Sequence, residues 1–131
     1  MASIFTKIIK GEIPCYKIAE DEHHFAFLDI RPLHIGHTLV IPKKEIDYIF
    51  DLEDAELQSL IVFAKKIAVA LKKSIACERI GIAVIGLEVP HAHIHLSPIN
   101  SIHDLDFKNA KEISKDTMLE IAEKIKANLD L

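Results

Sequence analysis

Three of the eight histidines of this 131-residue chain stand within five positions, in the segment PHAHIHLSP at residues 90–98. His91, His93 and His95 alternate with apolar residues, which is the period of a β-strand. A strand over this segment turns the apolar side chains toward the core and the three imidazoles toward the opposite face. The sequence therefore predicts that the imidazoles act as one group.

Three interpretations of this group are open at the level of the residues: local hydrogen bonding, a metal site and a phosphate-handling site. Same-face residues on a strand lie about 6.6 Å apart, whereas a zinc–nitrogen bond is about 2 Å long. His91 and His93 can therefore share an ion only with a third ligand from elsewhere. In the third interpretation, one imidazole attacks phosphorus while its neighbours donate hydrogen bonds to the phosphate oxygens.

Composition narrows the class of protein. Half of the residues are hydrophobic, 27% are charged and the net charge is −4, which predicts one globular domain over residues 1–131 and argues against long nucleic acid as a partner. Cys15 and Cys77 form no CxxC pair, which suits a reducing, cytoplasmic setting. We see no signal peptide and no apolar run long enough to cross a membrane.

The hydrophobic pattern predicts an α+β domain with an antiparallel sheet. We expect a short N-terminal helix capped by Ser3, strands over residues 15–20, 24–30, 37–42, 79–86 and 91–96, a long helix from Asp51, and a C-terminal helix from Ser114. The long helix is apolar around more than one face. Such a helix is either deeply buried or packed on a second subunit.

Three stretches together resemble the Hint-like branch of the histidine triad (HIT) family: HAHIHLS, IFTKIIKGEIPCYKIAED and FAFLDIRPLHIGHTLVIPKKE. The resemblance covers residues 3–98 and leaves residues 99–131 as an added C-terminal extension of a single HIT domain. It implies a HIT-like fold, with a five-stranded antiparallel sheet, one long central helix, a short N-terminal helix and, here, an added C-terminal helix. It also implies a homodimer formed through the long helix and a strand.

The resemblance further implies a cofactor-free nucleotide hydrolase. His93 would attack the α-phosphate of a purine nucleoside phosphoramidate or related nucleotide and form a nucleotidyl-histidine that water cleaves. His95 would contact the phosphate, His91 would orient His93 through its carbonyl, and His37 matches the fourth histidine of the family's cluster. The purine nucleoside monophosphate or phosphoramidate is then the expected partner.

The nucleoside side of the site follows from the same resemblance. Asp29 matches the carboxylate that accepts the ribose hydroxyls. The residues that match the apolar clamp around the base are Ile4, Phe5, Ile8, Phe27, Ile30 and Leu39. For these six, packing in the core is an equally good interpretation of an apolar residue. The remaining histidines at positions 23, 24, 34 and 103 show no period, and we expect them at the surface.

The chain departs from the family pattern in two places. Ser3 and Thr6 stand where some bacterial relatives carry zinc-binding cysteines, so we expect no structural zinc. A short GLEVP segment at residues 86–90 replaces a longer polar loop, and Glu88 stands where a leaving-group serine is expected. Glu88 would serve as a general acid only if burial raised its pKa. Two alternatives therefore stay open: a nucleotide-binding or sensing module without turnover, and a metal-dependent hydrolase.

Overall fold

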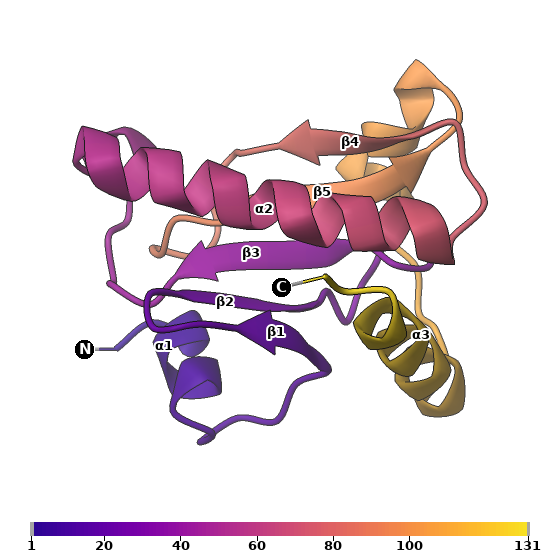
Figure 1. The fold of residues 1–131 in the computed structure, drawn as a ribbon, viewed down its shortest axis with the longest axis horizontal. Helices are drawn as coiled ribbons and strands as arrows, with labels where there is room; N and C mark the ends of the chain where they lie inside the picture. The colour runs from indigo at the N-terminus through magenta and orange to yellow at the C-terminus, as the bar shows by residue number, and fades with distance from the viewer. Residues whose placement is uncertain (1, 131) are drawn as a thin grey trace.

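The computed structural model describes residues 2–130 and contains one antiparallel sheet with strand order β1-β2-β3-β5-β4 (Figure 1). The strands are β1 (Lys17–Glu20), β2 (His24–Leu28), β3 (Thr38–Pro42), β4 (Arg79–Ala83) and β5 (Ile94–Ile99). The helices are α1 (Ile4–Ile9), α2 (Asp54–Ser74) and α3 (Lys115–Ala127). The predicted α+β fold, with its long central helix and two further helices, is confirmed.

Helix α2 begins three residues later than predicted, because Glu53 and Glu56 cap it with reciprocal side-chain bonds. Asp51 belongs instead to a short 3₁₀ turn, Ile49–Asp51. Lysines in the last turn of α2 complement the negative end of the helix dipole. The buried stripe of α2 comprises Leu60, Phe63, Ala64, Ile67, Ala70, Leu71 and Ser74.

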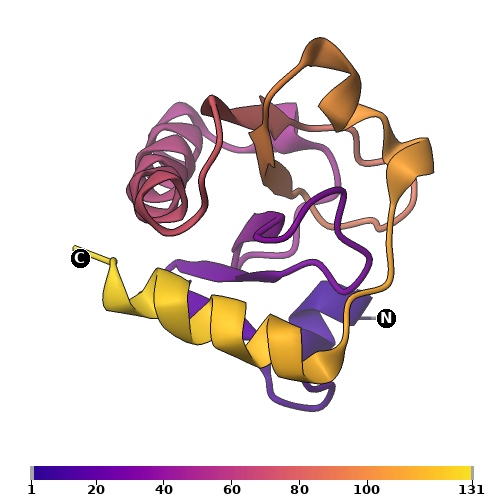
Figure 2. The ribbon, with the colours of Figure 1, turned by 90° about the vertical axis from the view of Figure 1, so that its right-hand side faces the viewer.

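The two faces of the sheet have different coverings. Helices α2 and α3 lie side by side on one face, and α1 lies on the other, as the two views show (Figures 1 and 2). Between the sheet and α2 and α3 is the main core, to which the histidine segment contributes Ala92, Ile94 and Leu96. On the α1 face lies a second apolar cluster, formed by Phe5, Ile8, Phe25, Phe27, Leu39 and Ile41.

The strand predicted over residues 91–96 begins only at Ile94, so His91 and His93 precede it. The pairing of β3 with β5 runs from Val40 and Ile94 to Thr38 and Leu96, and earlier residues have no ladder partner. The predicted alternation nevertheless holds, because the three histidines all face away from the main core. All three are buried, with exposed fractions of 0%, 7% and 8%. Strands β2 and β4 also end earlier than predicted, at Leu28 and Ala83.

Gly36 forms the tight turn that delivers His37 to the start of β3. Its φ is +96°, a left-handed conformation that favours glycine. A Cβ at this position would lie 3.1 Å from Cγ1 of Ile75, so packing against the end of α2 also requires glycine. The backbone at Gly36 thus couples the long helix to the histidine site.

Helix α3 is an integral part of the domain and not an appendage. It begins directly after Ser114, close to the predicted start, and the Ser114 hydroxyl caps it by accepting from the backbone N–H of Thr117. Met118, Ala122 and Ile125 enter the main core between β1 and α2. Within residues 2–130, none of the helices is long and apolar enough to cross a membrane.

Packing of α2 on the sheet predicts the effect of two matched substitutions. Ile67→Ala should lower the free energy of unfolding by about 2–5 kcal/mol, because it opens a cavity at a fully buried position. Val69→Ala, on an exposed position of the same helix, should change it by less than about 0.5 kcal/mol. Urea unfolding followed by circular dichroism measures both. Equal losses for the two variants would contradict the packing described.

Candidate active site

His93 has a free ring nitrogen beside an aromatic wall. Its Nδ1 lies 2.7 Å from the backbone carbonyl oxygen of His91, and because a carbonyl only accepts, Nδ1 carries the proton. Nε2 is then left with its lone pair. The ring packs edge-on against Phe5 at 5.0 Å and against His95 at 4.9 Å between centroids. His93 therefore presents a nucleophilic nitrogen in a mostly water-excluded setting.

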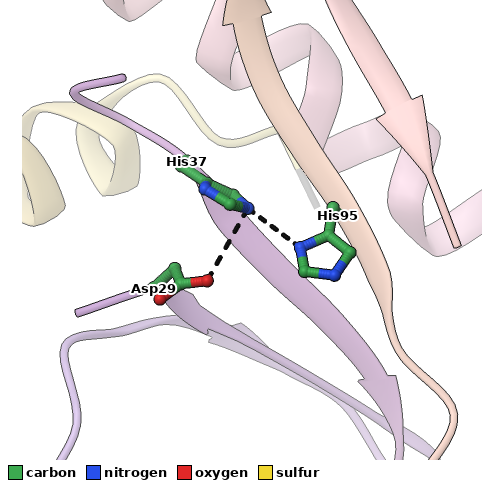
Figure 3. Close-up of side chains that lie close together, drawn as sticks. All are labelled: Asp29, His37 and His95. Atoms are coloured by element: carbon green, nitrogen blue, oxygen red, sulfur yellow. Dashed lines mark hydrogen bonds and ion pairs between the residues drawn. The ribbon is translucent and has the colours of Figure 1, made fainter. Parts of the chain in front are cut away.

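A backbone N–H determines the protons of the neighbouring pair, His37 and His95. The N–H of Leu33 donates to Nδ1 of His37 over 3.0 Å, so the proton of a neutral His37 must lie on Nε2. His37 Nε2 is 3.0 Å from Nδ1 of His95 and donates to it (Figure 3). Consequently His95 carries its proton on Nε2. The hydrogen bonds from Leu33 to His37 and from His37 to His95 thus leave His95 with an N–H that can donate at the site.

Burial keeps these imidazoles neutral. Removal from water, together with a smaller effect of the neighbouring histidines, lowers the pKa of His37 and that of His95 to about 4. Burial likewise lowers the pKa of His91. At pH 7 the site thus offers neutral imidazoles at His37 and His95, which agrees with the proton positions deduced from the hydrogen bonds.

Asp29 follows β2 and lies beside the same pair (Figure 3). Its Oδ1 accepts from the backbone N–H of Arg31 over 2.9 Å, and its Oδ2 is 3.8 Å from Nε2 of His37. Burial raises the pKa of the carboxyl, and the bond from Arg31 opposes that rise. The structure thus brings Asp29 together with the histidine cluster, as the sequence predicted.

Three potential metal ligands lie close together, one atom each from Asp29, His37 and His95, all within 4.8 Å of one another. Their spacing alone would allow a metal ion between them. A metal ion needs a lone pair from each imidazole. The lone pair of His37 points to the N–H of Leu33, and its other nitrogen holds the proton given to His95. The proton arrangement therefore does not fit a metal ion between these three groups.

The metal site considered from the sequence, on His91 and His93, fails the same test. Nε2 of His91 lies 2.8 Å from the carbonyl oxygen of Pro42 and must donate to it. Nδ1 of His91 lies 2.8 Å from the hydroxyl of Ser3 and accepts from it. Both nitrogens of His91 are engaged with protein groups, and the ring has no lone pair left for a metal.

The six residues expected to form an apolar clamp divide into two groups. Phe5, Ile8, Phe27 and Leu39 lie in the second apolar cluster, on the same face of the sheet as the histidines. The rings of Phe5 and Phe27 meet edge to face at 5.5 Å. Ile4 and Ile30 are instead exposed, at 49% and 67%. Four of the six therefore form an apolar floor beside His93, and two stand at its solvent side.

A residue that sequence reasoning missed also borders the site. Phe107, from the C-terminal extension, packs its ring edge-on to His95 at 4.8 Å and lies 6.3 Å from His37. It lies in a 3₁₀ turn, Phe107–Asn109, and the backbone N–H of Lys111 bonds the carbonyl of Pro32 to hold the segment in place. No periodic pattern surrounds Phe107, so only its aromatic type could have drawn attention to it.

Glu88 is exposed, so the burial on which its role as a general acid depended is not present. It lies in the irregular segment between β4 and β5. Its assignment to the nucleotide site remains an expectation from the position of GLEVP in the sequence.

His24 is buried, which corrects the expectation of a surface position. Its Nδ1 lies 3.0 Å from Oδ2 of Asp21 and its Nε2 lies 2.8 Å from the hydroxyl of Ser59, while its ring stacks on Phe63 at 5.0 Å. These groups line a groove of about 360 Å³. Ser59 lies within α2, and its backbone N–H takes part in the hydrogen bonds of that helix. We therefore interpret the cluster of Asp21, His24 and Ser59 as a structural contact that joins the β1–β2 hairpin to α2.

Sequence comparison agrees with the geometry of the histidine site. The family model for the HIT domain matches residues 10–102, which is most of the chain. The chain belongs to the HIT family. An uncharacterized HIT-like protein of Methanocaldococcus jannaschii is 45% identical over 100 residues, covering 72% of this chain and 77% of that protein. Adenosine 5′-monophosphoramidase HNT1 of Saccharomyces cerevisiae is 40% identical over 99 residues, covering 74% of this chain and 62% of the yeast protein.

Solved structures extend the likeness to the whole fold. A HIT-like protein of Bartonella henselae, described as involved in cell-cycle regulation and crystallised with an unknown ligand, superposes with a TM-score of 0.85 at 34% identity. The match covers 97% of this chain and 96% of the Bartonella chain. The HIT-like fold predicted from the sequence is therefore confirmed, and it includes the region of α3.

The lowered pKa values predict how stability depends on pH. The unfolded chain protonates its histidines near pH 6.5, whereas folded His37 and His95 resist protonation down to about 4. The folded state thus binds fewer protons in this window, and the stability present above pH 6.5 falls as the pH drops toward 4. Each of the two imidazoles should account for a loss on the order of 3 kcal/mol.

A substitution of His37 tests whether burial of the His37–His95 pair causes this dependence of stability on pH. In His37→Gln the free energy of unfolding should change less steeply between pH 6.5 and 4 than in the wild type. His23→Gln, which removes an exposed histidine, should keep the wild-type slope. Urea unfolding at closely spaced pH values provides the slopes. Identical slopes for all three proteins would show that burial of the pair is not the cause.

Proposed function

We propose that this HIT protein hydrolyses purine nucleoside phosphoramidates or related nucleotides at the α-phosphate, with His93 as nucleophile. The observation that carries the proposal is the arrangement of protons: a lone pair on Nε2 of His93 beside an N–H on Nε2 of His95. A nucleophile next to a neutral donor suits attack on an anionic phosphorus centre, where the donor stabilises the developing negative charge.

The first step forms one bond and breaks one. Nε2 of His93 bonds to the α-phosphorus while the bond between phosphorus and the leaving amine breaks, and the amine departs with a proton taken from the solvent. The ring of His93 then carries a positive charge, which the carbonyl of His91 stabilises through the Nδ1 proton. The N–H of His95 donates to a phosphate oxygen, while His37 keeps the proton of His95 in place.

The second step regenerates the enzyme. Water attacks the phosphorus of the nucleotidyl-histidine, the bond to His93 breaks, and the nucleoside monophosphate leaves with release of one proton. Asp29 would accept the ribose hydroxyls, and the four buried clamp residues would form one side of the base pocket. Support for this substrate class comes from the HNT1 relative, whose name describes an adenosine 5′-monophosphoramidase.

Release of AMP from adenosine 5′-phosphoramidate, measured by chromatography in the presence of a chelator, tests the reaction. His93→Ala should lower the rate by about a thousand-fold or more, because it removes the nucleophile. His103→Ala, at an exposed histidine outside the site, serves as the control and should retain activity. Wild-type activity that disappears in chelator would instead support the metal-dependent alternative.

A nucleotide-binding module without turnover is the second candidate, and the short GLEVP segment favours it. The segment offers Glu88 as its single polar side chain. AMP binding by the wild type without any release of AMP from the phosphoramidate would decide for this alternative.

We also propose that the protein is a homodimer. Within residues 2–130, β4 pairs with β5 alone, which leaves its other edge open. Ile82 on β4 is 51% exposed, and Val84, Ile85 and Leu87 after it are exposed as well. An exposed apolar strand edge is a surface that a second copy can extend by antiparallel pairing.

Sedimentation at micromolar concentration tests the dimer. Ile82→Asp should shift the protein to monomer, because a charge on the open edge opposes pairing. Leu119→Asp, at an exposed apolar position of α3, should leave the dimer intact. A wild type that sediments as a monomer would overturn the proposal.

A further inference from the structure

The carbonyl that orients His93 is not held by the sheet. Strand β5 begins at Ile94, so residues 91–93 lie outside its ladder. The local backbone bonds are those of the His91 N–H to Val89 and of the Ala92 N–H to Ile46. The Ala92 N–H and the His91 carbonyl share one planar peptide unit, so the bond to Ile46, next to Glu45, sets the direction of the carbonyl.

The His91 ring is tied on both edges to elements far away in the sequence. Nε2 donates to the carbonyl of Pro42 at the end of β3, over 2.8 Å. Nδ1 accepts from the hydroxyl of Ser3, the N-cap of α1, also over 2.8 Å. The ring is fully buried. The Pro42 carbonyl only accepts, so it fixes the tautomer with the proton on Nε2, and the bond from Ser3 holds the other edge of the same ring.

The Ser3 hydroxyl can donate only one proton, and its surroundings direct that proton to His91. The Ser3 oxygen already accepts from the backbone N–H of Thr6 over 3.1 Å. The Thr6 hydroxyl is a second possible acceptor, but it lies 3.3 Å away from the Ser3 oxygen, farther than Nδ1 of His91. Ser3 is thus left as a donor to the histidine.

Glu45 determines the direction of the Thr6 hydroxyl. Its Oε1 accepts from the Thr6 hydroxyl and from the Ser3 backbone N–H, each over 2.6 Å. These bonds lower the pKa of Glu45 to about 2, so the carboxylate is a pure acceptor at neutral pH. The proton of Thr6 therefore points to Glu45, and Thr6 cannot replace Ser3 as the donor to His91.

We propose that Ser3, Thr6 and Glu45 are positioning residues that hold the His91 ring and the segment at Ile46 in place, and so fix the carbonyl that orients His93. The inference rests on the proposed role of His93 as nucleophile. None of the three residues touches the reacting atoms in this account. Their effect reaches the phosphate through two hydrogen bonds, from Ser3 to the His91 ring and from His93 to the His91 carbonyl.

The test combines nitrogen-15 NMR of the imidazole rings with kinetics on adenosine 5′-phosphoramidate. In the wild type, His91 should be protonated on Nε2 and His93 on Nδ1. Ser3→Ala should keep the His91 proton on Nε2, because the Pro42 carbonyl holds it there, but should shift the Nδ1 signal of His91 toward that of a lone pair without a hydrogen bond and give His93 mixed tautomers. It should lower kcat about ten-fold, with KM changed less than about two-fold, because orientation and not binding is lost. Ser3→Thr keeps both the cap and the donor, and should restore wild-type spectra and kcat.

Ser114→Ala is the matched control, since it removes the hydroxyl cap of α3 without touching the site. It should leave both rings and kcat unchanged. Glu45→Ala removes the acceptor of the Ser3 N–H and of the Thr6 hydroxyl, and should likewise give His93 mixed tautomers. A wild-type His93 spectrum in Glu45→Ala would remove Glu45 and Thr6 from the proposal.

The two readouts separate this inference from the proposed function. Wild-type rings in Ser3→Ala would overturn the positioning role, whether or not kcat falls. If the wild type releases no AMP, the proposed reaction fails, but altered rings in Ser3→Ala would still establish that Ser3 sets the geometry of His91 and His93.

Discussion

The backbone N–H of Leu33 determines where the protons of the histidine cluster lie. By donating to Nδ1 of His37, it forces the proton of that ring onto Nε2, where it bonds His95. His95 must then present an N–H at its other nitrogen. Gly36 makes this possible, since the turn it forms brings Leu33 and His37 within hydrogen-bond distance across four positions. A backbone turn thereby determines the electrostatic character of a side-chain site.

The same principle operates on the other side of His93. There the carbonyls of Pro42 and His91, both acceptors only, fix protons on the rings of His91 and His93. Burial lowers the pKa of His91 and that of His95, so these two rings stay neutral at pH 7. Main-chain groups and burial together give neighbouring histidines unlike roles, acceptor or donor, without any charged partner in contact with the nucleophile.

Much of the fold could be predicted from the sequence, because each helix and strand carries its own periodic pattern. The alternation around His93 placed three imidazoles on one face, and the Ser3 cap marked the start of the first helix. Strand ends were less accurate, since the start of β5 depends on where β3 offers a partner. The burial of His24 escaped notice because its partner Ser59 is 35 residues away and on a different element.

In the site, too, some residues could be found from local sequence patterns and others only from long-range contacts. Asp29, His37 and the histidine segment were found from motifs, whereas Phe107 was not, because nothing near it in the sequence indicates that the extension returns to His95. The exposure of Ile4 and Ile30 likewise depends on how α1 and the segment after β2 meet the sheet. The residue types in the sequence suggested the chemistry of the site. The positions of the protons could be deduced only from the tertiary contacts.

The central claim, that Nε2 of His93 is the nucleophile, is tested most directly by trapping the covalent species. Wild-type protein would be mixed with adenosine 5′-phosphoramidate in chelator, quenched in base within the first turnover, digested and analysed by mass spectrometry. The account predicts an adenylyl group on the peptide that contains residues 90–98, located by fragmentation at His93 and missing in His93→Ala. AMP formation by the wild type with the adduct on another residue, or with no adduct at any time point, would contradict it.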